Sequence, residues 1–86
     1  MPTIAIFYGI VIRLYFADHP PPHVHAIYGN DEALVAIDPP RIIEGGLPRR
    51  AAALVLEWVA LRRLELIDAW NAAQQGLNPG KIAPLE

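Results

Sequence analysis

The chain has 86 residues, no cysteine and a formal net charge of −2 at pH 7, and 53% of its residues are hydrophobic. This length predicts one small domain over residues 1–86, which buries little surface and gains stability from a partner, either another protein or a second copy. The composition excludes a disordered chain, a disulfide scaffold, a cysteine-based zinc finger and an extended basic footprint for nucleic acid.

The first half of the chain has the composition of β-strands. Residues 10–16 alternate in hydrophobicity with the period of a half-buried strand, which places Phe16 on the apolar face. Residues 23–28 and 32–37 predict two more strands, joined by the two-residue turn Gly29-Asn30. Residues 41–44 predict a short edge strand before Gly45-Gly46.

The second half is helical. Pro48 suits the start of a helix over residues 49–63, and a second helix is expected over residues 65–75, with Gly76 as its C-cap. Trp58 and Trp70 lie on the apolar stripes of these helices, which indicates core positions, and Ile82 in the tail is expected to dock in a groove. The chain is therefore expected to be an α+β domain, with a small antiparallel sheet of three to four strands packed against one or two C-terminal helices.

The strand register predicts where the polar residues lie. A two-residue turn at Gly29-Asn30 puts Val24 and Ala26 on the apolar face and His23 and His25 on the opposite face. Residues expected on that polar face, with both imidazole rings projecting into water, are Arg13, Tyr15, His23, His25 and Glu32.

Three histidines, His19, His23 and His25, lie within seven residues and allow three interpretations. A zinc or nickel ion could be bound by the three rings together with Asp18 or Glu32, although the proline spacer keeps His19 apart. Alternatively, His23 and His25 could transfer protons at a phosphodiester whose charge an arginine neutralises. A third interpretation is architectural, with the polar side chains holding the backbone of the proline turn.

Arg49 and Arg50 lie where a positive charge opposes the dipole of the predicted helix. Two explanations are open. The pair could contact an anion, such as an RNA phosphate or an acidic partner. Alternatively, it could be a solvated helix end whose charge Glu44 or Glu57 offsets.

Several motifs of the chain occur together in one family of small bacterial proteins. The most specific is Asp18-His19 followed by Pro-Pro-His-Val-His at residues 21–25, accompanied by residues 7–13, 53–58 and 81–85. With these motifs the chain resembles domain-of-unknown-function family 4160. The resemblance implies a partner from a second small family, domain of unknown function 2442, in an arrangement like that of toxin–antitoxin pairs. The compact α+β member of such pairs is often a ribonuclease-like toxin.

These observations lead to one working hypothesis and two alternatives. We expect a component of a toxin–antitoxin-like module that binds a cognate small protein and acts on RNA, with His23 and His25 catalytic and Arg13 and Tyr15 beside them. The alternatives are a non-enzymatic interaction module and a protein that binds a divalent metal through His19, His23 and His25. The sequence contains no targeting signal and no apolar run of about 20 residues, so a cytoplasmic location away from the membrane is expected.

Overall fold

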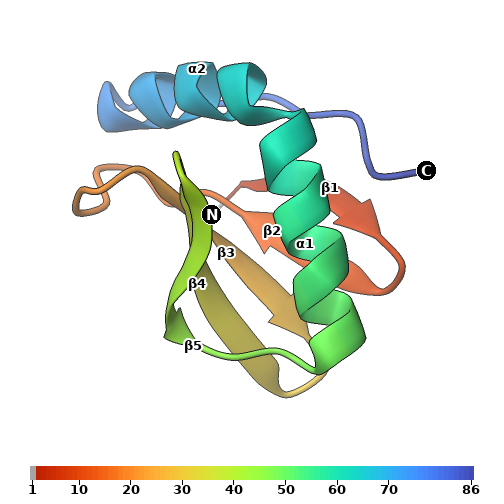
Figure 1. The fold of residues 1–86 in the computed structure, drawn as a ribbon. Coiled ribbons are helices and arrows are strands. Elements are labelled where there is room, and N and C mark those ends of the chain that lie inside the picture. The colour runs from red at the N-terminus through yellow and green to blue at the C-terminus, as the bar shows by residue number, and fades with distance from the viewer. Residues whose placement is uncertain (1) are drawn as a thin grey trace.

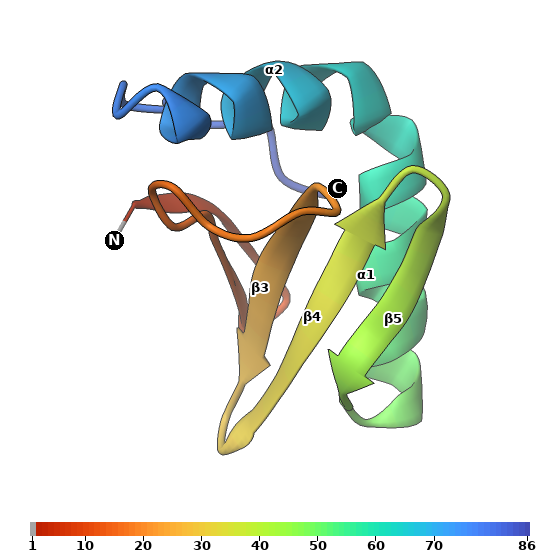
Figure 2. The ribbon, with the colours of Figure 1, turned by 90° about the vertical axis from the view of Figure 1, so that its left-hand side faces the viewer.

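The computed structural model describes residues 2–86. Within these residues, five strands form one antiparallel sheet in chain order: β1 (Thr3–Phe7), β2 (Ile10–Arg13), β3 (His23–Tyr28), β4 (Asp31–Ile37) and β5 (Pro40–Gly45). The helices α1 (Arg49–Leu61) and α2 (Arg63–Gln74) follow. α1 runs beside β4 and β5, whereas α2 lies across the end of the sheet where β3 begins and β4 ends (Figures 1 and 2). The predicted α+β class is confirmed.

The prediction of three to four strands is wrong, because residues 2–86 form five. The additional strand is β1, which forms a hairpin with β2 in which Phe7 pairs with Ile10. The turn residues Tyr8 and Gly9 have positive φ values of 52° and 78°, the conformation of a type I′ turn. A tyrosine at that position is unusual, so the sequence carries no strong signal for this turn.

β2 ends at Arg13, before the end of the alternating pattern at residue 16. The N–H of Leu14 donates to the carbonyl of Pro2 at 3.1 Å, and Ala17 adopts a left-handed φ of 52° that turns the chain. Phe16 is consequently 45% exposed, and the prediction that it lies on the apolar face is wrong.

The hairpin of β3 and β4 has the predicted register. Its pairs include Tyr28 with Asp31, Ala26 with Ala33, and Val24 with Val35. Gly29 has a positive φ of 59°, as the first residue of a type II′ turn requires. Because side chains alternate along a strand, Val24 and Ala26 face the core and His23 and His25 share the other face.

The core lies between the sheet and α1, and the C-terminal tail closes it. Val55 and Trp58 of α1 are fully buried in the same cluster as Val24. The indole N–H of Trp58 donates to the carbonyl of Ala83 at 2.8 Å, and the N–H of Ile82 donates to the carbonyl of Ile4 at 2.8 Å. The predicted docking of the tail is therefore confirmed. No helix in residues 2–86 has the length and hydropathy needed to cross a bilayer.

Both predicted helices are confirmed, and the chain breaks between them at Arg62. α2 ends in a Schellman motif, in which the N–H of Gly76 donates to the carbonyl of Ala73 at 3.1 Å and the N–H of Leu77 to that of Ala72 at 2.9 Å. Gly76 has the positive φ, 75°, that this motif needs. The N–H of Ala17 also donates to the carbonyl of Ala73, which fixes the last turn of α2 next to the loop that precedes β3.

Candidate metal centre

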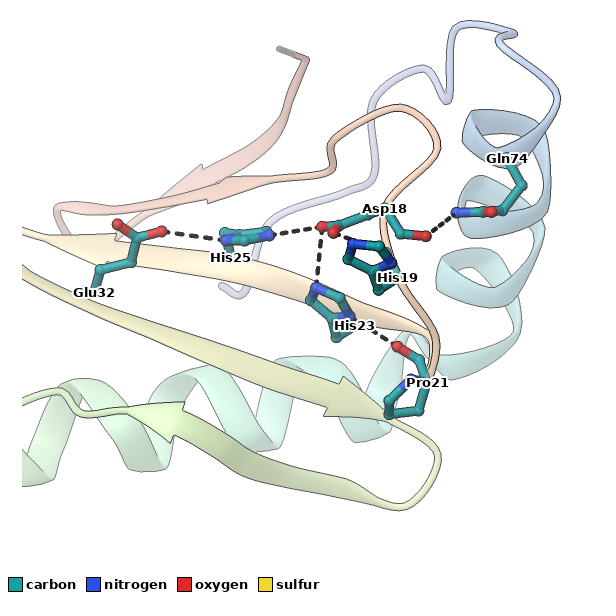
Figure 3. A network of polar contacts seen from close by, with 7 residues as sticks. All are labelled: Asp18, His19, Pro21, His23, His25, Glu32 and Gln74. Atoms are coloured by element: carbon teal, nitrogen blue, oxygen red, sulfur yellow. Dashed lines mark hydrogen bonds and ion pairs between the residues drawn. The ribbon is translucent and has the colours of Figure 1, made fainter.

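Three side chains from one short stretch of chain converge where β3 begins (Figure 3). Asp18 belongs to the loop before the strand, and His23 and His25 are alternate residues of β3. The Asp18 Oδ2 atom lies 3.0 Å from His23 Nε2 and 2.9 Å from His25 Nε2. The three candidate ligand atoms all lie within 4.8 Å of one another, so two imidazoles and a carboxylate point at a common position.

The backbone around Asp18 is held by contacts to a distant part of the chain. The side-chain amide of Gln74 donates to the Asp18 carbonyl at 2.9 Å, and the N–H of Ala17 donates to the carbonyl of Ala73 at 3.3 Å. The Oδ1 atom of Asp18 also accepts the N–H of His19 at 2.9 Å. These contacts orient the carboxylate so that its other oxygen, Oδ2, faces the histidines.

The contacts of His23 identify which of its nitrogens carries the proton. Its Nδ1 lies 2.8 Å from the carbonyl oxygen of Pro21, and since that oxygen can only accept, Nδ1 is the donor. In a neutral ring, Nε2 then carries no proton, and its lone pair is on the side of the Asp18 carboxylate. Although the two atoms are 3.0 Å apart, they do not have the direction of a hydrogen bond, and the buried Nε2 has no hydrogen-bond partner in residues 2–86. The lone pair of Nε2, which lies in the plane of the ring, therefore points beside Oδ2 and not at it.

His25 lies between two carboxylates. Its Nδ1 is 3.2 Å from Glu32 Oε2 and its Nε2 is 2.9 Å from Asp18 Oδ2. A neutral imidazole has one N–H and can satisfy only one of them. Metal-binding histidines commonly donate their second nitrogen to a carboxylate or a backbone carbonyl. His23 does so with Pro21, and His25 would do so with Glu32 in the tautomer that carries its proton on Nδ1.

Asp18 is favoured in its ionised form. Partial burial raises the pKa of this carboxyl, but the hydrogen bonds from His25 and the backbone of His19 and the positive potential of His23 and His25 outweigh burial. The net result is a pKa below the ordinary value for aspartate. The site thus places one ionised carboxylate beside the two rings.

The prediction that both rings project into water is wrong. His23 is 4% exposed and His25 is 9% exposed. The loop over residues 14–22 and the last turns of α2 cover this end of the polar face: the Trp70 ring lies 5.2 Å from that of His23, and the Tyr15 ring meets His25 edge-on at 4.2 Å. The Asp18 side chain, 20% exposed, is the most accessible of the three.

The other predicted site residues lie around this cluster. Arg13 pairs with His25 across β2 and β3, and its Nε is buried with no hydrogen-bond partner in residues 2–86. His19 is exposed and contributes its backbone N–H to Asp18, while the convergent group consists of Asp18, His23 and His25. Catalytic roles for Arg13, Tyr15 and the histidines stay predictions.

The sequence analysis proposed Asp18 or Glu32 as an additional metal ligand. The structure places these two carboxylates differently relative to the histidines. Asp18 contacts both histidines directly, whereas Glu32 contacts only the outer nitrogen of His25. The carbonyl of Pro21 and the amide of Gln74 were not identified from the sequence, because a backbone group and a residue 56 positions away from Asp18 carry no local signal.

Two histidines and one carboxylate are a ligand set for zinc and for other first-row divalent metals. Three protein ligands leave at least one coordination position for water or a substrate.

Among comparisons with known proteins, the family model of a domain of unknown function, DUF4160, matches residues 9–71. No curated protein and no solved structure matches the chain.

Proposed function

The chain belongs to the DUF4160 family, and we propose that it binds a divalent ion of zinc or a neighbouring transition metal through Asp18, His23 and His25. One observation carries the proposal. The Nε2 atom of His23, whose ring proton is used at Nδ1 by the Pro21 carbonyl, lies 3.0 Å from a carboxylate oxygen without a hydrogen bond between them. Two acceptors held this close repel each other, and a cation bound beside both would relieve that repulsion.

A second proton on His23 is the simplest competing cation. A protonated ring, however, gains most by directing its N–H at the carboxylate, and this contact lacks that direction. A metal ion bound off the line between the two atoms accepts both lone pairs at once. The same ion also binds the Nε2 atom of His25, while the Nδ1–H group of that ring donates a hydrogen bond to Glu32.

The donor set selects the class of metal. Calcium and magnesium prefer oxygen ligands, whereas two imidazoles and one carboxylate suit zinc, cobalt, nickel or iron(II). The ligands carry one negative charge in total, which leaves a bound divalent ion with a net positive charge. A bound zinc ion would lower the pKa of a coordinated water to about 7 and so supply hydroxide at neutral pH.

The direct test is metal stoichiometry in protein purified without a histidine tag. We expect about one zinc ion per chain after equilibration with micromolar free zinc, and loss of this ion in His23→Gln and Asp18→Asn. His19→Gln is the matched control, because it removes a neighbouring imidazole that lies outside the group. Sub-stoichiometric zinc in the parent protein, or equal loss in His19→Gln, would refute the proposal.

A second candidate is action on RNA within a toxin–antitoxin-like pair that includes a cognate small protein. It is favoured by Arg13, which pairs with His25 across the sheet and has a buried Nε with no hydrogen-bond partner in residues 2–86. A phosphate bound beside the site would supply an anion with which that guanidinium could pair. Acid–base catalysis by His23 and His25 without a metal is less favoured, because Asp18 competes with a phosphate for the same two rings.

Expression in cells tests this second candidate. Alanine at His23 or His25 is expected to abolish growth inhibition and RNA degradation in a protein that still folds, although removing a buried ring lowers its melting temperature. Unchanged growth inhibition in these variants would eliminate catalysis by these residues. Lower stability without any RNA degradation in the parent protein would instead support the interaction module.

A further inference from the structure

A cavity of about 240 Å³ lies at the opposite end of β3 from the histidines. It is lined by the turn between β1 and β2, the last residue of β3 and the first two turns of α1. A cavity of roughly 150 Å³ is enough to hold benzene in a protein interior. This cavity therefore has room for one ring or branched side chain with a small polar group attached.

The walls of the cavity are mostly apolar and aromatic. Ile10 and Leu54 line it together with the rings of Tyr8 and Tyr28, which are 54% and 39% exposed respectively. The Tyr28 ring packs over Gly9, where an added Cβ would come within 3.4 Å of it. Tyr8 adopts its left-handed φ of 52° in the same turn. Two large rings are thus held at the rim of a hollow that neither of them fills.

The beginning of α1 gives the cavity a positive charge. Arg50 is one of the lining residues, no side chain caps the first turn of α1, and that turn contains no acidic residue. Across residues 2–86, no carboxylate lies within ion-pair distance of Arg49 or Arg50. Neither Glu44 nor Glu57 forms an ion pair with the two arginines, and the arginines add to the positive end of the helix dipole.

We propose that this cavity binds an apolar carboxylate. The acid group pairs with Arg50 at the beginning of α1, and the ring or branched side chain lies against Ile10, Tyr28 and Leu54. Apolar walls with one charged group at the edge are the usual composition of a small-ligand site. Two sources share this chemistry: a free small-molecule acid and the C-terminal residue of a polypeptide.

The test measures binding by ¹⁵N chemical-shift changes with two pairs of probes. The first pair is phenylacetate and phenylacetamide. The second is a short peptide ending in phenylalanine, with a free or an amidated C-terminus. In both pairs the acid should shift the amides around Tyr28 and Leu54, with a millimolar or lower dissociation constant, and the amide should bind about tenfold more weakly. Tighter binding of the peptide acid identifies a polypeptide terminus as the source, and tighter binding of phenylacetate identifies a small molecule.

Arg50→Gln and Arg49→Gln form a matched pair of variants. Both remove one exposed charge from the first turn of α1, but only Arg50 lines the cavity. We expect about a tenfold loss of acid binding in Arg50→Gln and less than a twofold loss in Arg49→Gln. No shifts with either acid at about 10 mM, equal binding of acid and amide, or equal loss in both variants would overturn the proposal. The result is independent of the metal, because the cavity and the histidines lie at opposite ends of β3.

Discussion

Glu32 allows the metal proposal to be tested without changing a ligand. Its carboxylate lies 3.2 Å from Nδ1 of His25, on the side of the ring away from Asp18. Replacing Glu32 with glutamine keeps the size of the side chain and an oxygen that can accept the Nδ1 proton, but it removes the negative charge. That charge makes the imidazole a stronger ligand and fixes its tautomer, so its loss should weaken metal binding.

The structure sets the size of the expected effect. Changes to residues that support a metal ligand typically lower affinity by about 10- to 100-fold. The Glu32 side chain is 50% exposed and its contact with His25 is long for a charge-assisted bond, which places it at the lower end. We therefore expect a loss of about tenfold, equivalent to about 1.4 kcal/mol.

Competition for zinc with a chromophoric chelator at neutral pH measures this change. Glu44→Gln is the matched control, because it removes the same charge from an exposed residue of β5 that pairs with Leu34 and has no ion-pair contact with a histidine. Affinity should be within about twofold of the parent protein in this control. An equal loss of affinity in both variants would mean that removing any nearby negative charge weakens zinc binding, and it would refute the reasoning. An unchanged affinity in Glu32→Gln would refute it as well.

Three further predictions concern the same structure. Binding of Cu²⁺ or Co²⁺ should quench the fluorescence of Trp70, whose ring lies 5.2 Å from that of His23; the quenching should be absent in Trp70→Phe, and its persistence there would place the ion elsewhere. Gly45→Ala should lower the free energy of unfolding by about 3 kcal/mol, because the added methyl group meets the Glu32 carbonyl at a positive φ of 72°. Gly46→Ala, where a Cβ meets nothing within 4 Å, should change it by less than about 0.5 kcal/mol in the same urea titrations. In metal-free protein, the lowered pKa of Asp18 means that the unfolded chain takes up this proton first as pH falls. The stabilisation is therefore complete above the ordinary aspartate range and is lost as pH falls through the lowered pKa, a dependence that Asp18→Asn should remove; an identical pH profile in that variant would contradict this assignment.

Local patterns predicted the parts of the fold that depend on neighbouring residues. The register of β3 and β4 follows from a two-residue glycine turn and strict alternation, both of which the sequence displays directly. The hairpin of β1 and β2 was missed because its turn begins with Tyr8, a residue without a turn preference. The end of β2 was placed too late because the alternating pattern continues to Phe16, while the chain direction is changed at Ala17 by backbone conformation.

The candidate site shows the same division. The shared face of His23 and His25 follows from their spacing on a strand. Their burial does not, because it depends on Trp70 and on the contact between Gln74 and the Asp18 carbonyl. Hydrophobicity along the chain indicated that Trp70 is buried, but no local pattern could indicate that it lies against an imidazole.

The bond from Gln74 to the carbonyl of Asp18 joins the end of α2 to the carboxylate that faces the histidines. If Asp18 holds a metal, then ion binding and the seating of α2 on the sheet are reciprocally coupled, since whatever strengthens one must strengthen the other by the same factor. Withdrawing the ion with a chelator would then accelerate amide hydrogen exchange in the last turns of this helix, and a partner that pulled the helix away would release the ion.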